Sequence, residues 1–179
     1  MKNILVISTS LRRNSNSEAL ADEFIKGAKE SGNKVEKATL RDKNIAFCKG
    51  CLACQSLHRC VIKDDSQEIV EKMLKADVIV WATPVYYYCM SGQMKTMIDR
   101  ANPLFAMDYA FRDVYLLASA AEDEESAVKG TIEGLKGWIE CFERAEFAGY
   151  VFAGGVNGEG EVKGHKALKE AYKTGKSIN

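Results

Sequence analysis

The chain has 179 residues, a length that fits one domain with a sizeable core. Its 25 basic and 25 acidic residues balance, so net charge gives no reason to expect nucleic acid as a partner. No apolar run approaches the roughly 18 to 20 residues that span a bilayer, and Met1-Lys2 leads into a strand rather than a signal peptide. We therefore expect a cytoplasmic protein without a membrane partner. In that compartment six cysteines favour metal or redox chemistry over disulfides.

Apolar and polar runs alternate along the chain in the pattern of strands and helices. Strands are predicted at residues 4–7, 34–40, 78–82, 114–118 and 146–153, the second with one wetter face. Helices are predicted from the Ser15 cap to Glu30, from the cap candidates Asp64 to Ser66 as far as Leu74, from Ser91 to Arg100, from Glu122 to Phe142, and from Glu161 to Lys176.

This alternation predicts a single α/β domain, residues 1–179, with a doubly wound five-stranded parallel sheet between two layers of helices. Because the second strand looks like an outer one, we expect the order 2-1-3-4-5. In that order the first and third strands diverge at a switch point, and ligands bind outside their carboxyl ends. The loops 8–17 and 83–92 fall there, with residues 119–121 as a third wall.

The loop after the first strand is suited to an anion. It carries hydroxyl and amide side chains with two arginines, and it has no carboxylate before Glu18. Ser15 and Glu18 fit a capping box, so a helix N-terminus should point its free amides and positive dipole end at this loop. The alternative is a merely polar turn with a good cap. No glycine is present, which excludes the dinucleotide fingerprint and the P-loop here, and we interpret the glycines at 154–160 as a turn.

A second unusual segment is the cysteine-rich loop at residues 45–62, which has no sustained helical or strand period. Its spacing, Cys48-x2-Cys51-x2-Cys54-x5-Cys60, is close to the compact runs that hold cubane iron–sulfur clusters. Four cysteines can also form a closed zinc site, and an empty thiol loop is the third reading. We interpret Cys89 and Cys141 as packing residues.

Together these segments resemble the flavodoxin-like NAD(P)H-dependent FMN reductase family, and more narrowly its iron–sulfur flavoprotein branch. The pieces that carry the resemblance are residues 8–17, the Thr83-Pro84-Val85-Tyr86-Tyr87 run, the segment 95–100 ending Asp99-Arg100, and the cysteine loop followed by Asp64-Asp65. Two positions depart from the family: Thr9 stands where glycine is common, and Leu11 stands where the branch often has proline.

The resemblance implies a site for FMN. It assigns the phosphate to Ser10, Arg12, Asn16 and Ser17, while Ser15 remains a cap. It assigns the isoalloxazine ring to Pro84, Val85, Tyr86 and Tyr87, with Ser119 and Ala120 opposite. Ordinary core or interface packing is the alternative for at least one of the tyrosines at 86–88. The resemblance also implies a [4Fe–4S] cluster on Cys48, Cys51, Cys54 and Cys60 that passes single electrons to FMN.

The implied function is an FMN-dependent oxidoreductase that takes electrons from NAD(P)H or a small carrier and reduces a quinone, flavin or other small acceptor. No acid–base pair is required, because the flavin carries out the redox chemistry, and we interpret His58 and His165 as surface or structural residues. The alternative is an electron-transfer module that docks on protein partners. A non-flavin binding protein on the same scaffold is a third class. By resemblance we expect a homo-oligomer, a dimer or tetramer.

Overall fold

The computed structural model describes all 179 residues and contains the predicted parallel sheet. Its strands are β1 (Asn3–Ser8), β2 (Lys34–Thr39), β3 (Val78–Tyr86), β5 (Asp113–Ser119) and β6 (Glu146–Ala153). They lie in the order β2-β1-β3-β5-β6, and every neighbouring pair is parallel. This order is the predicted 2-1-3-4-5. A two-residue strand, β4 (Cys89–Met90), pairs antiparallel with the end of β3.

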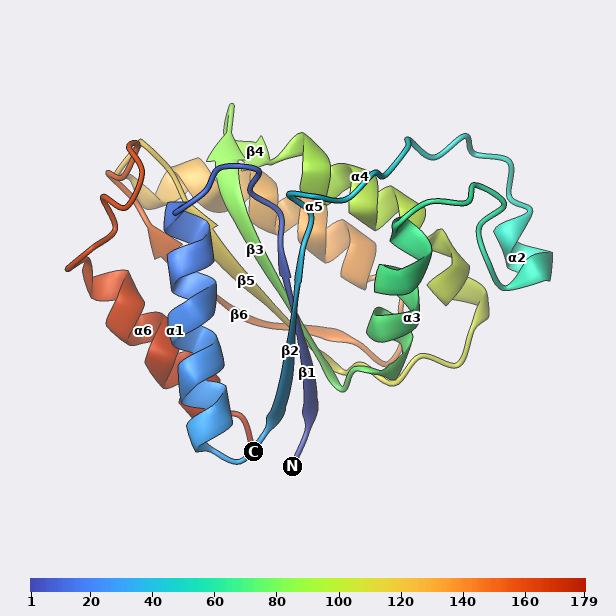
Figure 1. Cartoon of the computed structure of the whole chain (residues 1–179), viewed down its shortest axis with the longest axis horizontal. Helices are drawn as coiled ribbons and strands as arrows, with labels where there is room; N and C mark the ends of the chain where they lie inside the picture. The colour runs from blue at the N-terminus through green and yellow to red at the C-terminus, as the bar shows by residue number, and fades with distance from the viewer.

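Helices cover both faces of the sheet and make the three layers visible in Figure 1. One face carries α1 (Asn16–Glu30) and α6 (Lys166–Lys176). The other carries α3 (Ser66–Lys75), α4 (Gly92–Arg100) and α5 (Lys129–Ile139). Three shorter pieces complete the chain, namely α2 (Cys54–Leu57) and the 3-10 helices η1 (Asn102–Ala106) and η2 (Glu125–Val128).

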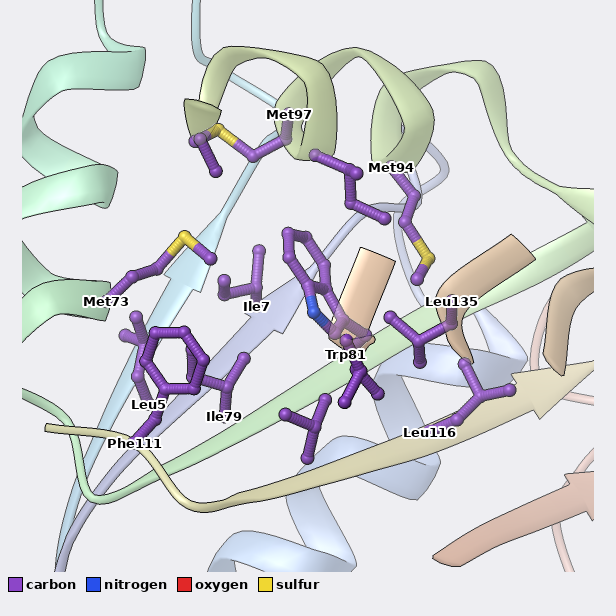
Figure 2. Close-up of a cluster of buried hydrophobic side chains, with 14 of the residues drawn as sticks. Leu5, Ile7, Met73, Ile79, Trp81, Met94, Met97, Phe111, Leu116 and Leu135 are labelled. Carbon is purple, nitrogen blue, oxygen red and sulfur yellow. The ribbon is translucent and has the colours of Figure 1, made fainter. Parts of the chain in front are cut away.

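The central strands are apolar throughout because both of their faces are buried. In β1, Leu5 and Ile7 belong to the core under α3, α4 and α5, whereas Ile4 and Val6 belong to the core under α1 and α6. Figure 2 shows the first core, in which Trp81 of β3 lies between the sheet and Met94 of α4. Outer strand β2 is mostly exposed, as its looser pattern predicts.

On the second face, α1 and α6 approach each other closely enough for their backbones to touch. A Cβ atom at Gly27 would lie 2.0 Å from the carbonyl oxygen of Tyr172, and one at Gly175 would lie 2.1 Å from that of Phe24. Glycine at both positions is therefore a packing requirement. The contact fixes α1, and thereby fixes the N-terminus that α1 presents to the loop after β1.

Two helices are shorter than predicted. The helix expected at 122–142 is helical only over 129–139, with η2 in front of it. Residues Glu122 and Asp123 instead pack against Gly154, and the Gly155 amide donates to the Glu122 carbonyl at 3.2 Å. The helix expected at 161–176 begins at Lys166, because Gly160 and Gly164 have positive φ and His165 supplies the cap.

The sheet brings separate loops to one edge. The loop after β1, the β3–β4 hairpin and the turn after β6 all lie at the end of the sheet opposite the two chain termini (Figure 1). The cysteine loop leaves the body on the α3 and α4 side and carries α2 at its tip. None of the helices has the length and apolar character needed to cross a membrane.

Candidate functional site

The loop after β1 ends in a capped helix N-terminus. Ser15 Oγ accepts a hydrogen bond from the Glu18 amide at 3.2 Å, which confirms Ser15 as the cap of α1. The amides of Asn16 and Ser17, in the first turn, have no intrahelical partner by the geometry of a helix. They and the helix dipole face the loop, as an anion site requires.

The capping box is only half formed, which corrects the prediction for Glu18. Its carboxylate does not return to Ser15 but pairs with Lys37 at 2.9 Å and with Arg41. Burial alone would raise the pKa of Glu18, but the hydrogen bonds from Lys37 and Arg41 outweigh burial and lower it. Arg41 also donates to the carbonyl oxygen of Arg12 at 3.1 Å, so this cluster braces the loop from the β2 side.

Within the loop, Ser17 is the residue that points most directly to a bound ligand. Ser17 is fully buried, and its Oγ atom has no hydrogen-bond partner. A buried hydroxyl without a partner costs about 1–3 kcal/mol, so such atoms usually mark a place where a ligand or water completes the bonding. Ser8 Oγ is unpartnered in the same way, but Ser8 does not line the cavity described below.

The turn after β6 closes the site from a side that the sequence analysis missed. Arg12 Nη1 donates to the Asn157 carbonyl oxygen at 2.6 Å. The Asn16 side chain donates to the Gly158 carbonyl oxygen at 2.9 Å and accepts from the Val162 amide at 3.2 Å. The prediction of a turn at residues 154–160 is correct, and the position of this turn at the carboxyl end of β6 indicates that it borders the site.

A buried hydroxyl cluster joins the first loop to the segment after β3. Thr9 Oγ1 lies 3.1 Å from Ser91 Oγ, and Thr83 Oγ1 lies 3.2 Å from the same atom. Ser91 also caps α4, accepting from the Met94 amide at 3.3 Å. Thr9 therefore has a defined role in holding β1, β3 and α4 together.

Residues 84–90 form a hairpin rather than an open loop. Tyr86 pairs with Cys89, and the two residues between them, Tyr87 and Tyr88, have φ of 48° and 61°. Such a two-residue turn usually needs glycine or asparagine. Tyr86, Tyr87 and Tyr88 are all exposed, Tyr87 completely, so the core-packing alternative fails for them. In Figure 1 this hairpin, whose second strand is β4, projects from the end of the sheet.

These segments enclose one cavity of about 230 Å³ at the switch point. Its lining contains all ten residues assigned to the cofactor: Ser10, Arg12, Asn16, Ser17, Pro84, Val85, Tyr86, Tyr87, Ser119 and Ala120. The remaining lining residues are Ser15, Ala121, Val156 and Asn157. Four segments that are distant in sequence thus converge on a single space, with polar groups at the α1 end and the hairpin at the other.

The four loop cysteines line a second, larger cavity of about 540 Å³, together with Cys141 and the aromatic side chains of Phe105, Trp138 and Phe142. No three Cys, His, Asp or Glu side chains come close enough together to hold a metal ion in this structure. Three of the sulfurs nevertheless accept hydrogen bonds. Cys54 Sγ accepts from Asn102 Nδ2 at 3.0 Å, Cys60 Sγ from Arg100 Nη2 at 3.3 Å, and Cys48 Sγ from the Gly50 amide at 3.4 Å.

Cys141 and Cys89 differ from their predicted packing role. Both side chains are exposed, Cys141 beyond the end of α5 and Cys89 in the hairpin. The two histidines match their structural interpretation. His58 ends α2 in the left-handed region, and His165 Nδ1 caps α6 by accepting from the Ala167 amide at 3.1 Å.

The fold and the first cavity define a class: a three-layer flavodoxin-like α/β protein with a cavity at the switch point that is lined by a polar loop and a helix N-terminus. Within that class, the family model for NADPH-dependent FMN reductase matches residues 2–157. The chain belongs to this family, whose members are oxidoreductases that use FMN and a pyridine nucleotide.

Individual relatives refine the placement. An iron–sulfur flavoprotein of Methanosarcina thermophila is 33% identical over 134 residues, covering 74% of this chain and 70% of the relative. Other matched iron–sulfur flavoproteins are covered over only about half their length. A Bacillus subtilis protein named for NAD(P)H-dependent, FMN-containing oxidoreductase activity is 29% identical over 94% of this chain and 93% of its own.

Solved structures agree on the fold. An NAD(P)H:quinone oxidoreductase from Methanothermobacter marburgensis superimposes with a TM-score of 0.71 over 98% of this chain and 96% of its own, at 16% identity. At that identity the likeness concerns the fold alone.

Proposed function

We propose that the cavity at the switch point holds FMN and that the chain passes electrons from NAD(P)H or a small electron carrier to a quinone, flavin or other small acceptor. The observation that carries the proposal is the convergence of all ten assigned residues on one cavity. A buried, unpartnered serine hydroxyl beside a helix N-terminus fits a phosphate group chemically.

The residues at the α1 end divide into two roles. Ser10, Ser17 and the first amides of α1 bind the phosphate, and Arg12 adds a charge-assisted contact. The Asn16 side chain is already engaged by the turn at 158–162, so it positions that turn while its backbone amide remains available.

At the hairpin end, Pro84 and Val85 form an apolar wall, and Tyr86 and Tyr87 supply aromatic surface at the mouth. Ser119 and Ala120 face them from the end of β5. Bound FMN supplies the hydride and electron transfer. The protein orients the ring, keeps water from it and aims backbone amides at its polar edge, so no side chain of this chain is assigned as a proton donor or base.

We further propose that Cys48, Cys51, Cys54 and Cys60 hold a [4Fe–4S] cluster. The four thiols line one cavity, and N–H groups donate to three of them, which is the environment that stabilises cluster thiolates. Zinc is the competing occupant. Iron and sulfide analysis of anaerobically purified protein distinguishes the two, because a zinc site contains neither.

A specific observation favours the second function, an electron-transfer module for protein partners. Phe47 is 79% exposed, and Leu52, Leu57 and Val61 of the same loop are also exposed. Between residues 45 and 63 the loop carries Lys49, Arg59 and Lys63 but no carboxylate. An apolar surface with basic residues suits an acidic protein.

Steady-state oxidation of NADH and NADPH with a quinone acceptor tests the enzyme proposal. Turnover with either nucleotide supports the reductase, whereas bound FMN without any turnover favours the module. We also propose a homo-oligomer, dimer or tetramer, in which a neighbouring copy covers the exposed tyrosines of the hairpin. Light scattering on the holoprotein tests this, and a monomer would contradict it.

A further inference from the structure

Arg100, the last residue of α4, is completely buried, which is rare for arginine. Its guanidinium forms a two-pronged ion pair with Asp64, Nη1 to Oδ2 at 2.5 Å and Nη2 to Oδ1 at 3.1 Å. Arginine is suited to such pairs because its planar fork matches the carboxylate. The pair joins α4 to the segment that directly follows the cysteine loop.

The same two terminal nitrogens of Arg100 also reach both ends of that loop, whereas Nε has no partner. Nη1 donates to the Ala46 carbonyl oxygen at 2.8 Å, where the loop begins. Nη2 donates to the Ile62 carbonyl oxygen at 3.2 Å, where the loop ends, and to Cys60 Sγ at 3.3 Å. One side chain therefore ties the two ends of the loop together and contacts one of its four thiols.

Asp64 is itself held in place by the loop and by α3. Its carboxylate accepts from the Ala46 amide at 2.9 Å and from the amide and hydroxyl of Ser66 at 3.0 and 2.7 Å. Next to it, Asp65 accepts from the Asn44 amide at 2.6 Å. Several hydrogen bonds thus hold the base of the loop, whereas Cys48 and Cys51, further along the loop, are exposed.

We propose that Arg100 is the positioning residue of the cysteine site: it closes the base of the loop and holds Cys60 toward the cavity that the other three cysteines line. This inference rests on the proposed cluster function of the loop. Closing the loop in advance removes part of the entropy cost of gathering four ligands. The N–H donated to Cys60 Sγ, and the positive charge behind it, favour the more negative, reduced state of a thiolate cluster.

The test compares Arg100→Lys and Arg100→Gln with wild type and with Arg112→Lys. Arg112 is a suitable control because its guanidinium donates only to the carbonyls of residues 109–111. Two measurements are made on each protein. The first is hydrogen exchange, in the metal-free protein, of the Ala46 amide and of the Asp65 amide, which donates to the Asn44 carbonyl oxygen at 3.2 Å. The second is iron and sulfide content after anaerobic reconstitution, with the midpoint potential of the cluster that forms.

In both Arg100 variants we expect exchange at the loop base to rise about tenfold or more, because buried charge-assisted bonds are lost, while exchange in the sheet stays unchanged. Iron content should fall, and the midpoint potential should be more negative in Arg100→Gln than in Arg100→Lys, which keeps the charge. Arg112→Lys should match wild type in hydrogen exchange, iron content and midpoint potential.

Unchanged exchange in both Arg100 variants would overturn the proposal, as would equal potentials in Arg100→Lys and Arg100→Gln. The two measurements test the cluster and the loop separately. If the wild type takes up no iron and sulfide, the cluster function fails, while exchange at Ala46 and Asp65 still decides whether Arg100 closes the loop. Global unfolding is recognised by faster exchange in β1 and β3, and Asp64→Asn then serves as the milder second variant, with the same expected rise at the loop base.

Discussion

The guanidinium of Arg12 donates a hydrogen bond of 2.6 Å to the backbone carbonyl of Asn157, a residue 145 positions further along the chain. This bond connects the loop after β1 to the turn after β6 across the mouth of the cavity. It holds a positive charge at the rim, beside the helix N-terminus where the phosphate is proposed to bind. The connection explains why a turn at the far end of the sequence belongs to the same site.

Replacing Arg12 with alanine should weaken FMN binding by about tenfold to a hundredfold, the range for one charge-assisted hydrogen bond. Fluorescence titration of the flavin-free protein measures this. Arg13→Ala is the matched control, since Arg13 is exposed and does not line the cavity. Equal losses in the two variants would mean that only general positive charge matters and would contradict the assignment of Arg12.

Ser17→Ala should separate binding from stability. The variant removes a buried hydroxyl that has no partner in the free protein, so the free energy of unfolding should stay the same or rise by up to about 1–3 kcal/mol. FMN affinity should fall, because that hydroxyl is assigned to the phosphate. Ser8→Ala removes an equally buried, unpartnered hydroxyl outside the cavity and should leave affinity unchanged. A Ser17→Ala protein with full affinity would refute the assignment.

The contact between α1 and α6 predicts opposite effects of two glycine substitutions. Gly175→Ala places a methyl group 2.1 Å from the Phe24 carbonyl oxygen and should destabilise the protein by about 1–3 kcal/mol or more. Gly137→Ala in α5, where a Cβ meets no atom within 4 Å, should stabilise it by about 0.5–1 kcal/mol through helix propensity. Urea unfolding curves of both variants test this, and a neutral Gly175→Ala would show that the helices can separate without cost.

The Asp64–Arg100 pair predicts a specific acid sensitivity. Burial raises the pKa of Asp64, but hydrogen bonds from Arg100, the Ala46 amide and Ser66 lower it from 3.8 to about 2. A carboxyl with a lowered folded-state pKa stabilises the protein above its unfolded pKa and loses this contribution as pH falls. The contribution, on the order of 2 kcal/mol, should therefore disappear between about pH 4 and pH 2.

Urea unfolding of wild type and Asp64→Asn across this pH range tests whether the contribution of Asp64 to stability falls as the pH falls. The difference in unfolding free energy between wild type and Asp64→Asn should be largest at pH 6 and should shrink as the pH falls. Asp42→Asn, at an exposed position, should differ little from wild type at any pH. A difference for Asp64→Asn that did not change with pH would indicate that the substitution acts through packing rather than through the charge.

Most of the fold was predictable because a parallel sheet buried on both faces requires continuous apolar strands, and β1 and β3 stand out for that reason. The ten cofactor residues were predictable because the carboxyl ends of neighbouring parallel strands meet at one edge. Asn157 was missed because backbone carbonyls leave no sequence signature. The Tyr87–Tyr88 turn was missed because it lacks the glycine or asparagine that indicates such turns in a sequence.

The four cysteines of the second site were predictable from the sequence, but the residues that hold their loop in place were not. Spacing alone identifies four thiols in one loop. The residues that hold the loop, Arg100 of α4 and Asn102 of η1, contact it only through the tertiary fold. A buried arginine is not distinguishable from a surface one in an amphipathic helix by its sequence neighbours. The pairing of Arg100 with Asp64, 36 positions away, required the structure.

The central claim is that the loop after β1 and the N-terminus of α1 bind the phosphate of FMN. The most direct measurement is a parallel titration of the flavin-free protein with FMN and with riboflavin, which differs only by lacking the phosphate. We predict that FMN binds at least about a hundredfold more tightly, as expected for two or more charge-assisted hydrogen bonds, and that Arg12→Ala and Ser17→Ala reduce this ratio. Equal affinities for the two flavins would contradict the account.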